Sequence, residues 1–227
     1  MGQVVGTLST IGLGCRRSER LVFTGLNLRL ESGGALLVVG ANGSGKSSLL
    51  RLLAGLLHPF AGTILWGGAE IIDDATAHRA RVAYLGHGDA IKPTLTVAEE
   101  IDFWTALDGA GEQASKAALA AMGLTQLTSF PCRHLSAGQK RRLAIARVLA
   151  RINAPLWILD EPTNGLDAEA RQRLASALAA HRDGGGMVVA ASHEGLELAG
   201  AEILELGPFA AQARIAEVRG LEVDQVI

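Results

Sequence analysis

Apolar residues along the chain gather into short runs whose spacing separates strands from helices. Three of these runs are continuous, over residues 35–39, 156–159 and 187–191. An uninterrupted apolar run of this length is typical of a strand buried on both faces, as in a parallel sheet covered by helices. Within residues 1–34 the pattern instead alternates, with Leu26, Leu28 and Leu30 apolar, and it predicts antiparallel strands. Two shorter strands are predicted over 64–66, before Gly67-Gly68, and over 203–206.

Other segments carry apolar residues at helical spacing. Leucines recur in this way from Leu49 to Leu56, which predicts a helix continuing toward Gly62. Residues 90–150 are rich in Ala, Leu and Glu, and a second helix is predicted over 168–181. The helical region is interrupted at Pro93, Gly109, Gly111 and Pro131. We therefore expect one α/β domain over 1–227, with a mixed central sheet, antiparallel N-terminal strands and a helical sub-domain at about 90–150.

A glycine-rich loop lies between the first buried strand and the helix that follows. It reads Gly40-Ala41-Asn42-Gly43-Ser44-Gly45-Lys46-Ser47 and fits G-x-x-x-x-G-K-[ST] without a mismatch. Glycines let successive N–H groups turn toward an anion, and the helix N-terminus adds its dipole. Lys46 is predicted to reach the β- and γ-phosphates, and Ser47 to bind Mg²⁺. The predicted nucleotide-binding set is Gly40, Ala41, Asn42, Gly43, Ser44, Gly45, Lys46, Ser47 and Ser48.

A second pair of candidate residues follows the apolar run over 156–159. Asp160 and Glu161 stand at the carboxyl end of that strand, where open α/β sheets bind their ligands. Asp160 is positioned to hold Mg²⁺, as the aspartate of a Walker B strand does. Glu161 is the best candidate for the general base that orients an attacking water.

The segment Leu135-Ser136-Ala137-Gly138-Gln139 predicts the start of another helix. Ser136 and Gln139 have capping-box spacing. The buried stripe is predicted to be Leu143, Ala146, Val148 and Leu149, with an exposed basic patch at Lys140, Arg141 and Arg142. A capped N-terminus with the backbone of Ser136 and Gly138 open is a second candidate anion site. Within one fold it is not expected to reach the glycine-rich loop.

Together these motifs resemble those of an ABC-type ATPase domain, over about residues 20–206. The resemblance implies ATP and Mg²⁺ as cofactors and head-to-tail pairing of two copies. In such a pair Ser136, Gly138 and Gln139 close over the γ-phosphate held by the partner. It also implies that His193, after the strand over 187–191, contacts the γ-phosphate, and that Asp167 communicates between the two sites.

Two positions depart from the family pattern. After the strand Val82-Ala83-Tyr84-Leu85 the family usually has a glutamine, where this chain has His87. His87 could accept from a metal-bound water, or serve structure alone. The aromatic residue that stacks on adenine is replaced near Cys15 by Arg16 and Arg17. Arg17 or Arg16 could stack on the base, because a guanidinium is planar, and a solvated surface arginine is the alternative.

Composition limits the environment and the partners. The 227 residues carry a formal net charge of −2, which gives no indication of nucleic acid as a partner. Cys15 and Cys132 have no metal-site spacing and favour a reducing cytoplasm. We expect no signal peptide, and no run approaches the ~20 apolar residues that cross a bilayer. A membrane role would therefore need integral partners.

A narrower resemblance is to the haem exporter ATPases of cytochrome c maturation, the CcmA family. It rests on Tyr84-Leu85-Gly86-His87, on residues 91–100 and on residues 135–142, 156–162 and 64–66. That family implies a peripheral subunit on the cytoplasmic face of the inner membrane, acting in haem export or release of a haem chaperone. Two alternatives are the ATPase subunit of another ABC exporter and a non-transport clamp acting on nucleic acid or the ribosome. Bound membrane subunits would favour transport, and salt-dependent nucleic-acid binding would favour the clamp.

Overall fold

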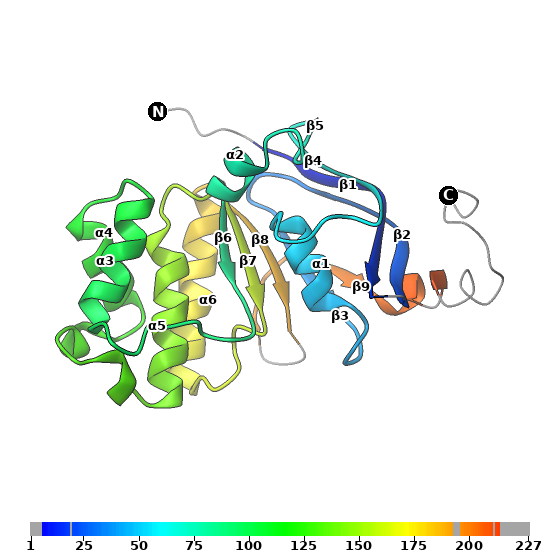
Figure 1. Cartoon of the computed structure of the whole chain (residues 1–227). Coiled ribbons are helices and arrows are strands. Elements are labelled where there is room, and N and C mark those ends of the chain that lie inside the picture. Colours follow the sequence, from blue (N-terminus) through cyan, green and yellow to red (C-terminus); the bar gives the residue numbers. More distant parts are fainter. Residues whose placement is uncertain (1–5, 19, 193–195, 211, 214–227) are drawn as a thin grey trace.

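A five-stranded sheet forms the centre of the molecule. The computed structural model describes residues 6–18, 20–192, 196–210 and 212–213 of the chain. The strand order of the sheet is β6-β7-β8-β3-β9, and every pairing among these five strands is parallel. Helices and a second sheet flank it (Figure 1). The strands are β3 (Ala35–Val39), β6 (Val82–Leu85), β7 (Leu156–Asp160), β8 (Met187–Ala191) and β9 (Glu202–Glu205). Strands β7 and β8 are buried at every position, as their apolar sequences predict.

The antiparallel strands form a sheet of their own, in the order β2-β1-β4-β5. The predicted strands at the N-terminus are confirmed, but the prediction of a mixed central sheet is wrong, since the described strands of that sheet are all parallel. Leu8, Leu13 and Phe23 of the long hairpin pack into a core against the central sheet, which explains why these strands lie over it rather than at its edge. The strands are β1 (Leu8–Arg17), β2 (Arg20–Leu30), β4 (Ala61–Trp66) and β5 (Ala69–Glu70).

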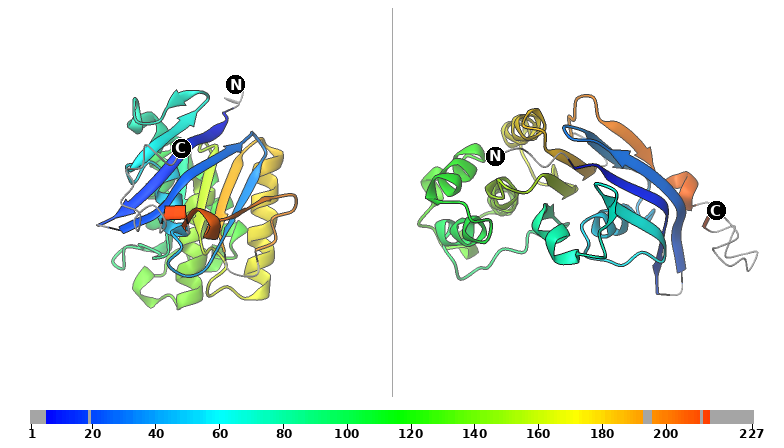
Figure 2. Two further views of the ribbon diagram at one scale, coloured as in Figure 1. Left: turned by 90° about the vertical axis from the view of Figure 1, so that its right-hand side faces the viewer. Right: turned by 90° about the horizontal axis from the view of Figure 1, so that it is seen from above.

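Helix α1 (Lys46–Leu53) packs in the core shared by the two sheets (Figure 2). It is shorter than predicted. Gly55 adopts a left-handed φ of 67°. The Gly55 N–H donates to Leu52 and the Leu56 N–H donates to Arg51, and these two bonds form a Schellman motif. The leucine pattern therefore continues past the real end of the helix, and Leu56 is 54% exposed.

Helices α3, α4 and α5 pack together beside the sheet, in the region where a helical sub-domain is predicted (Figure 1). Residues of α5 and α6 share a second core with Trp157 and Val188 of the sheet. Adjacent strand residues, such as Ile158, face the first core instead, so the two faces of the sheet are both covered. The helices are α2 (Ala75–Ala80), α3 (Val97–Leu107), α4 (Glu112–Ala121), α5 (Ala137–Ala150) and α6 (Ala168–Asp183), with 3₁₀ turns at Thr125–Leu127 and Cys132–His134.

The predicted basic patch on α5 is wrong. Lys140 and Arg142 are half-buried, and the side chain of Arg141 is only 6% exposed. Consecutive residues on a helix point about 100° apart, so three adjacent cations cannot share one face. Among the described helices, none combines the length and apolarity that a membrane span requires.

Candidate active site

The glycine-rich loop joins the end of β3 to the start of α1. Gly45 has a φ of 104°, which a residue with a side chain rarely adopts. A Cβ atom at this position would also lie 2.5 Å from Val22 Cγ1. No side chain within the described residues caps the start of α1. The loop thus brings a helix N-terminus with open backbone N–H groups to the surface of the molecule, as an anion site needs.

Lys46, the first residue of α1, is 7% exposed. Its Nζ donates to the carbonyl oxygens of Gly40, at 2.8 Å, and Ala41, at 3.4 Å. The ammonium group therefore lies along the inside of the loop, and the loop holds a positive charge together with its helix N-terminus.

Two acidic residues lie at the carboxyl end of β7. Asp160 is 1% exposed, and its Oδ2 accepts no hydrogen bond from any described residue. Glu161 is 8% exposed and has a φ of 50°, so its backbone lies in the left-handed region. Burial raises the pKa of the nearby Tyr84 hydroxyl, against a smaller opposite effect of its hydrogen bond with Arg51, and the charge of Asp160 adds to the rise.

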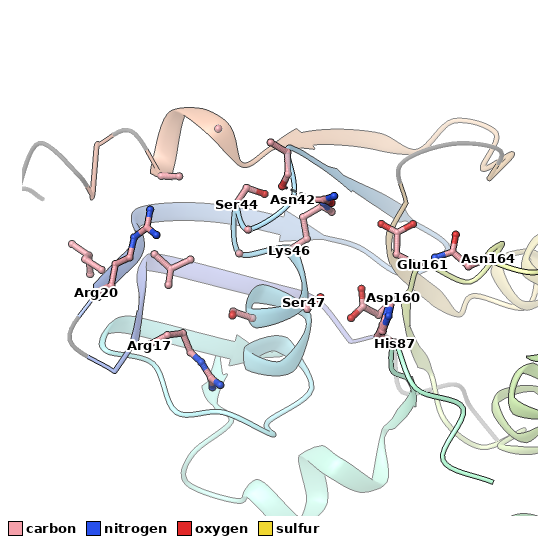
Figure 3. A pocket seen from close by; sticks show the side chains of 18 residues that line it. Arg17, Arg20, Asn42, Ser44, Lys46, Ser47, His87, Asp160, Glu161 and Asn164 are labelled. Atoms are coloured by element: carbon pink, nitrogen blue, oxygen red, sulfur yellow. Dashed lines mark hydrogen bonds between the residues drawn. The ribbon is translucent and has the colours of Figure 1, made fainter.

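One cavity of about 820 Å³ joins these residues. Its lining includes the loop from Ala41 to Ser48 together with His87, Asp160 and Glu161. Figure 3 shows Lys46 and Ser47 on one side of this space and Asp160, Glu161 and His87 on the other. The volume falls in the range of small-molecule sites. The structure thus brings together the predicted metal and base residues and the predicted phosphate residues from Ala41 to Ser48, whereas Gly40 is not among the lining residues.

Arginines line the other end of the cavity, where an aromatic residue is usual in the resembled family. Arg17, at the end of β1, contributes to the lining, as predicted. The guanidinium of Arg16 instead lies 4.2 Å from the ring centroid of Phe60, and Arg16 is not among the lining residues. Of the two arginines considered, the geometry therefore favours Arg17. Burial raises the pKa of the neighbouring Cys15, against a smaller opposite effect of its hydrogen bond with Ser48.

The predicted residues of the second anion site lie outside this cavity. Ser136, Gly138 and Gln139 are not among the lining residues of the cavity. The predicted capping box is formed: Ser136 Oγ accepts from the Gln139 N–H at 3.2 Å, and Gln139 Oε1 accepts from the Ser136 N–H at 2.8 Å. Asp167 caps α6 by accepting from the Ala170 N–H. His193 lies outside the described residues.

Arg20 and Asn164 were not predicted as site residues, although both line the cavity. Arg20 pairs with Arg17 across the β1–β2 hairpin. The alternation of the two strands could have indicated this pairing. Asn164 follows Glu161 by three residues, and its N–H donates to the Glu161 carbonyl at 3.2 Å, so a turn returns it to the site.

Comparisons with known proteins agree with this geometry. The ABC transporter family model matches residues 23–164. The CcmA cytochrome c biogenesis ATP-binding export protein of Rhodospirillum rubrum is 53% identical over 86% of this chain and 84% of its own. That of Paramagnetospirillum magneticum is 50% identical over 90% and 95%, respectively. The chain also shares its fold with the ATP-binding subunit of an ABC transporter, with a TM-score of 0.76 at 23% identity, covering 96% and 97% of the two chains.

A bacterial Atm1-family ABC exporter with ATP bound matches with a TM-score of 0.78 at 24% identity, covering 90% of this chain and 38% of that one. The matched family model spans the phosphate loop, His87, Asp160 and Glu161, whereas Arg17 and Arg20 at the other end of the cavity lie before the matched region. The chain is therefore an ATP-binding ATPase of the ABC transporter family, and within it belongs to the CcmA cytochrome c biogenesis ATP-binding export proteins.

Proposed function

We propose that two copies of this chain close head to tail on two ATP molecules with Mg²⁺, and that this motion drives haem export through integral membrane subunits. One observation carries the proposal: the N-terminus of α5, a candidate anion site, lies outside the chain's own cavity. A phosphate that reaches Gly138 would have to be held by another chain. Head-to-tail pairing provides this, because each copy then completes the cavity of the other.

Ser47 and Asp160 are the residues that would hold Mg²⁺. Asp160 offers a buried carboxylate oxygen without a protein partner in the described part of the chain, and Mg²⁺ prefers oxygen ligands of this kind. Ser47 lines the same cavity with a hydroxyl group. When bound, the ion would neutralise charge on the β- and γ-phosphates. These residues therefore fit a magnesium site.

The remaining residues act on the phosphates and on water. Lys46 and the loop N–H groups bind and orient the phosphates, in the positive field at the start of α1. Glu161 orients the attacking water and accepts its proton. Arg17 lies against the base, and His87 accepts a hydrogen bond at the edge of the metal site.

The role in haem export follows from the relatives. Eight of them, at 44–53% identity, are named cytochrome c biogenesis ATP-binding export proteins. ATPase subunits of ABC transporters act together with integral membrane subunits, so the chain would work with such subunits at the cytoplasmic face of the inner membrane. Affinity purification from membranes with tagged protein would identify these subunits, and haem accumulation in cells lacking the chain would test the substrate.

Pairing is tested with the variant Glu161→Gln, which keeps the shape of the side chain but cannot accept a proton. We expect it to bind ATP, to hydrolyse it at least about 100-fold more slowly, and to sediment as a dimer with ATP and Mg²⁺. Lys46→Ala in the same background is the control and should stay monomeric. If Glu161→Gln with ATP and Mg²⁺ remains monomeric, both in solution and in the complex with its membrane subunits, the paired mechanism is ruled out.

A further inference from the structure

Arg141 connects the signature helix α5 to the catalytic edge of the same chain. Its Nη1 donates to the Gly86 carbonyl at 3.3 Å and to Asp89 Oδ1 at 3.0 Å. Its Nη2 donates to the carbonyl oxygens of Asp160, at 2.9 Å, and Glu161, at 2.6 Å. One guanidinium therefore bonds α5 to both the loop that carries His87 and the end of β7.

The guanidinium of Arg141 is buried, although its transfer out of water is costly. Its side chain is 6% exposed and forms an ion pair with Asp89, whose side chain is 30% exposed. Its Nε has no hydrogen-bond partner in the described part of the chain. Moving a guanidinium out of water carries a large desolvation penalty, which one ion pair and backbone carbonyls offset only in part. Because four acceptors from two segments converge on this one guanidinium, Arg141 fixes the positions of these segments relative to α5.

The geometry that Arg141 holds is the backbone of Glu161. This residue has a left-handed φ of 50°, a conformation that persists only where its surroundings fix it. The Glu161 N–H donates to the Ala191 carbonyl at 2.8 Å. On the other side, the Glu161 carbonyl accepts from Arg141 and from the Asn164 N–H. Arg141 is thus among the contacts that hold the Glu161 backbone, from which the carboxylate extends.

A second contact joins α5 to the same turn. Gly138 lies so close to Gly165 that a Cβ atom on it would be 3.2 Å from the Gly165 carbonyl oxygen. Gly138 is in the first turn of α5 and Arg141 is three residues further on. The start of the helix therefore approaches the Glu161–Gly165 segment at two places, with Gly138 beside Gly165 and Arg141 bonded to Glu161.

We propose that Arg141 is a positioning residue that couples the two ATP sites of the pair. This inference rests on the proposed head-to-tail pairing. When the α5 N-terminus closes over the nucleotide of the partner, the helix carries Arg141 with it, and Arg141 sets the Glu161 backbone and the His87 loop of its own chain. ATP at one site then makes the other site competent, which is a coupling free energy between sites.

The test uses Arg141→Met in the full chain, which removes the donors and keeps most of the volume. We expect the Kd for a non-hydrolysable ATP analogue to stay within about threefold, kcat to fall at least about tenfold, and the Hill coefficient for ATP to approach 1. Arg141→Lys should restore part of kcat, because an ammonium group reaches fewer of the four acceptors. The matched control is Arg142→Met, since Arg142 is half-buried and donates to the Met122 carbonyl at 3.4 Å. It should keep the wild-type kcat and Hill coefficient.

Each outcome decides the inference. Arg141→Met with wild-type kcat and Hill coefficient overturns it. If Arg141→Met fails to fold, Arg141→Lys decides: reduced cooperativity at an unchanged melting temperature supports coupling, and full cooperativity overturns it. The double variant Arg141→Met/Glu161→Gln should still form the ATP-dependent dimer. If Glu161→Gln forms the ATP-dependent dimer but Arg141→Met keeps the wild-type kcat and Hill coefficient, the coupling alone is refuted. If Glu161→Gln does not dimerise, the pairing on which the coupling rests is refuted.

Discussion

The helices α1 and α5 both begin at a predicted anion site, but their first turns differ. Helix α1 follows Gly45, its N-cap residue, without a side-chain cap from the described residues, and its first residue, Lys46, is buried. Helix α5 follows Ser136, its N-cap residue, and the capping box there already uses the N–H groups of Ser136 and Gln139. The first terminus keeps its donors for a ligand, whereas the second has already satisfied two of them.

Because of this difference, the anion site at α1 is complete within one chain, whereas the candidate site at α5 requires groups from another chain. The start of α1 has backbone donors, a cation and a cavity that it shares with Asp160. In the first turn of α5 the capping box leaves the N–H groups of Ala137 and Gly138 for a ligand. The buried cation of the next turn, Arg141, donates to backbone carbonyls of its own chain instead. We infer that α5 recognises a phosphate only when another chain presents it. The comparison thus predicts that changes at α1 affect binding and that changes at α5 affect pairing.

The largest effect is expected for Lys46→Ala. Removal of a buried charge-assisted contact to the phosphates should weaken ATP binding at least about 100-fold. Titration calorimetry with the monomer measures this directly. Ser136→Ala in the same assay should bind ATP as the wild type does. Equal losses in the two variants would contradict the division between the two helices.

A smaller effect is expected for Gly138→Asp on α5. The new carboxylate would meet the partner's phosphates with like charge, and its Cβ would crowd the Gly165 carbonyl at 3.2 Å. We expect monomer binding of ATP to be retained, with ATP-dependent dimerisation lost and kcat lowered about tenfold or more.

The matched control is Gly111→Asp, at the N-terminus of α4, where no atom lies within 4 Å of the added Cβ. It places the same charge at a helix start that has no proposed ligand. Sedimentation with ATP compares the two variants. A Gly138→Asp variant that pairs as well as Gly111→Asp would show that α5 does not face a phosphate.

The same contrast shows what the sequence could predict. The phosphate loop, the end of β7 and the capping box of α5 depend on contacts within a few residues, and all three were predicted in place. Arg141 was predicted to be exposed, because three adjacent cations are usually solvated. Its burial depends on Gly86 and Asp89, more than 50 residues away in sequence. No local pattern contains that information.

The end of α1 and the separate antiparallel sheet also differ from the prediction, because neither is determined by the local apolar pattern. The leucine pattern extends beyond α1, and the left-handed Gly55 ends the helix against that pattern. The separate antiparallel sheet arises from packing of the hairpin into the core that it shares with α1 and the central sheet, which the alternation of Leu26 and Leu28 does not specify. His193 lies outside the described residues, so its predicted contact with the γ-phosphate stays a prediction.

The smallest effect, and the most specific, concerns the capping boxes at the starts of α3 and α5. Thr96 and Glu99 form at the start of α3 the same reciprocal bonds that Ser136 and Gln139 form in α5. Ser136→Ala and Thr96→Ala should each lower the free energy of unfolding by about 1 kcal/mol, because each leaves a helix N–H without its side-chain acceptor. Urea unfolding monitored by circular dichroism measures both.

The two alanine variants should differ in a second measurement. Only Ser136 lies where α5 is proposed to meet the partner's phosphate, so Ser136→Ala should also weaken ATP-dependent dimerisation of the Glu161→Gln background, while Thr96→Ala should not. Since the loss of the cap is common to both, subtracting one variant from the other leaves the contribution of Ser136 to pairing. If the two variants lose equal stability and dimerise equally well, the hydroxyl of Ser136 serves the helix alone, and recognition at α5 would fall to its backbone.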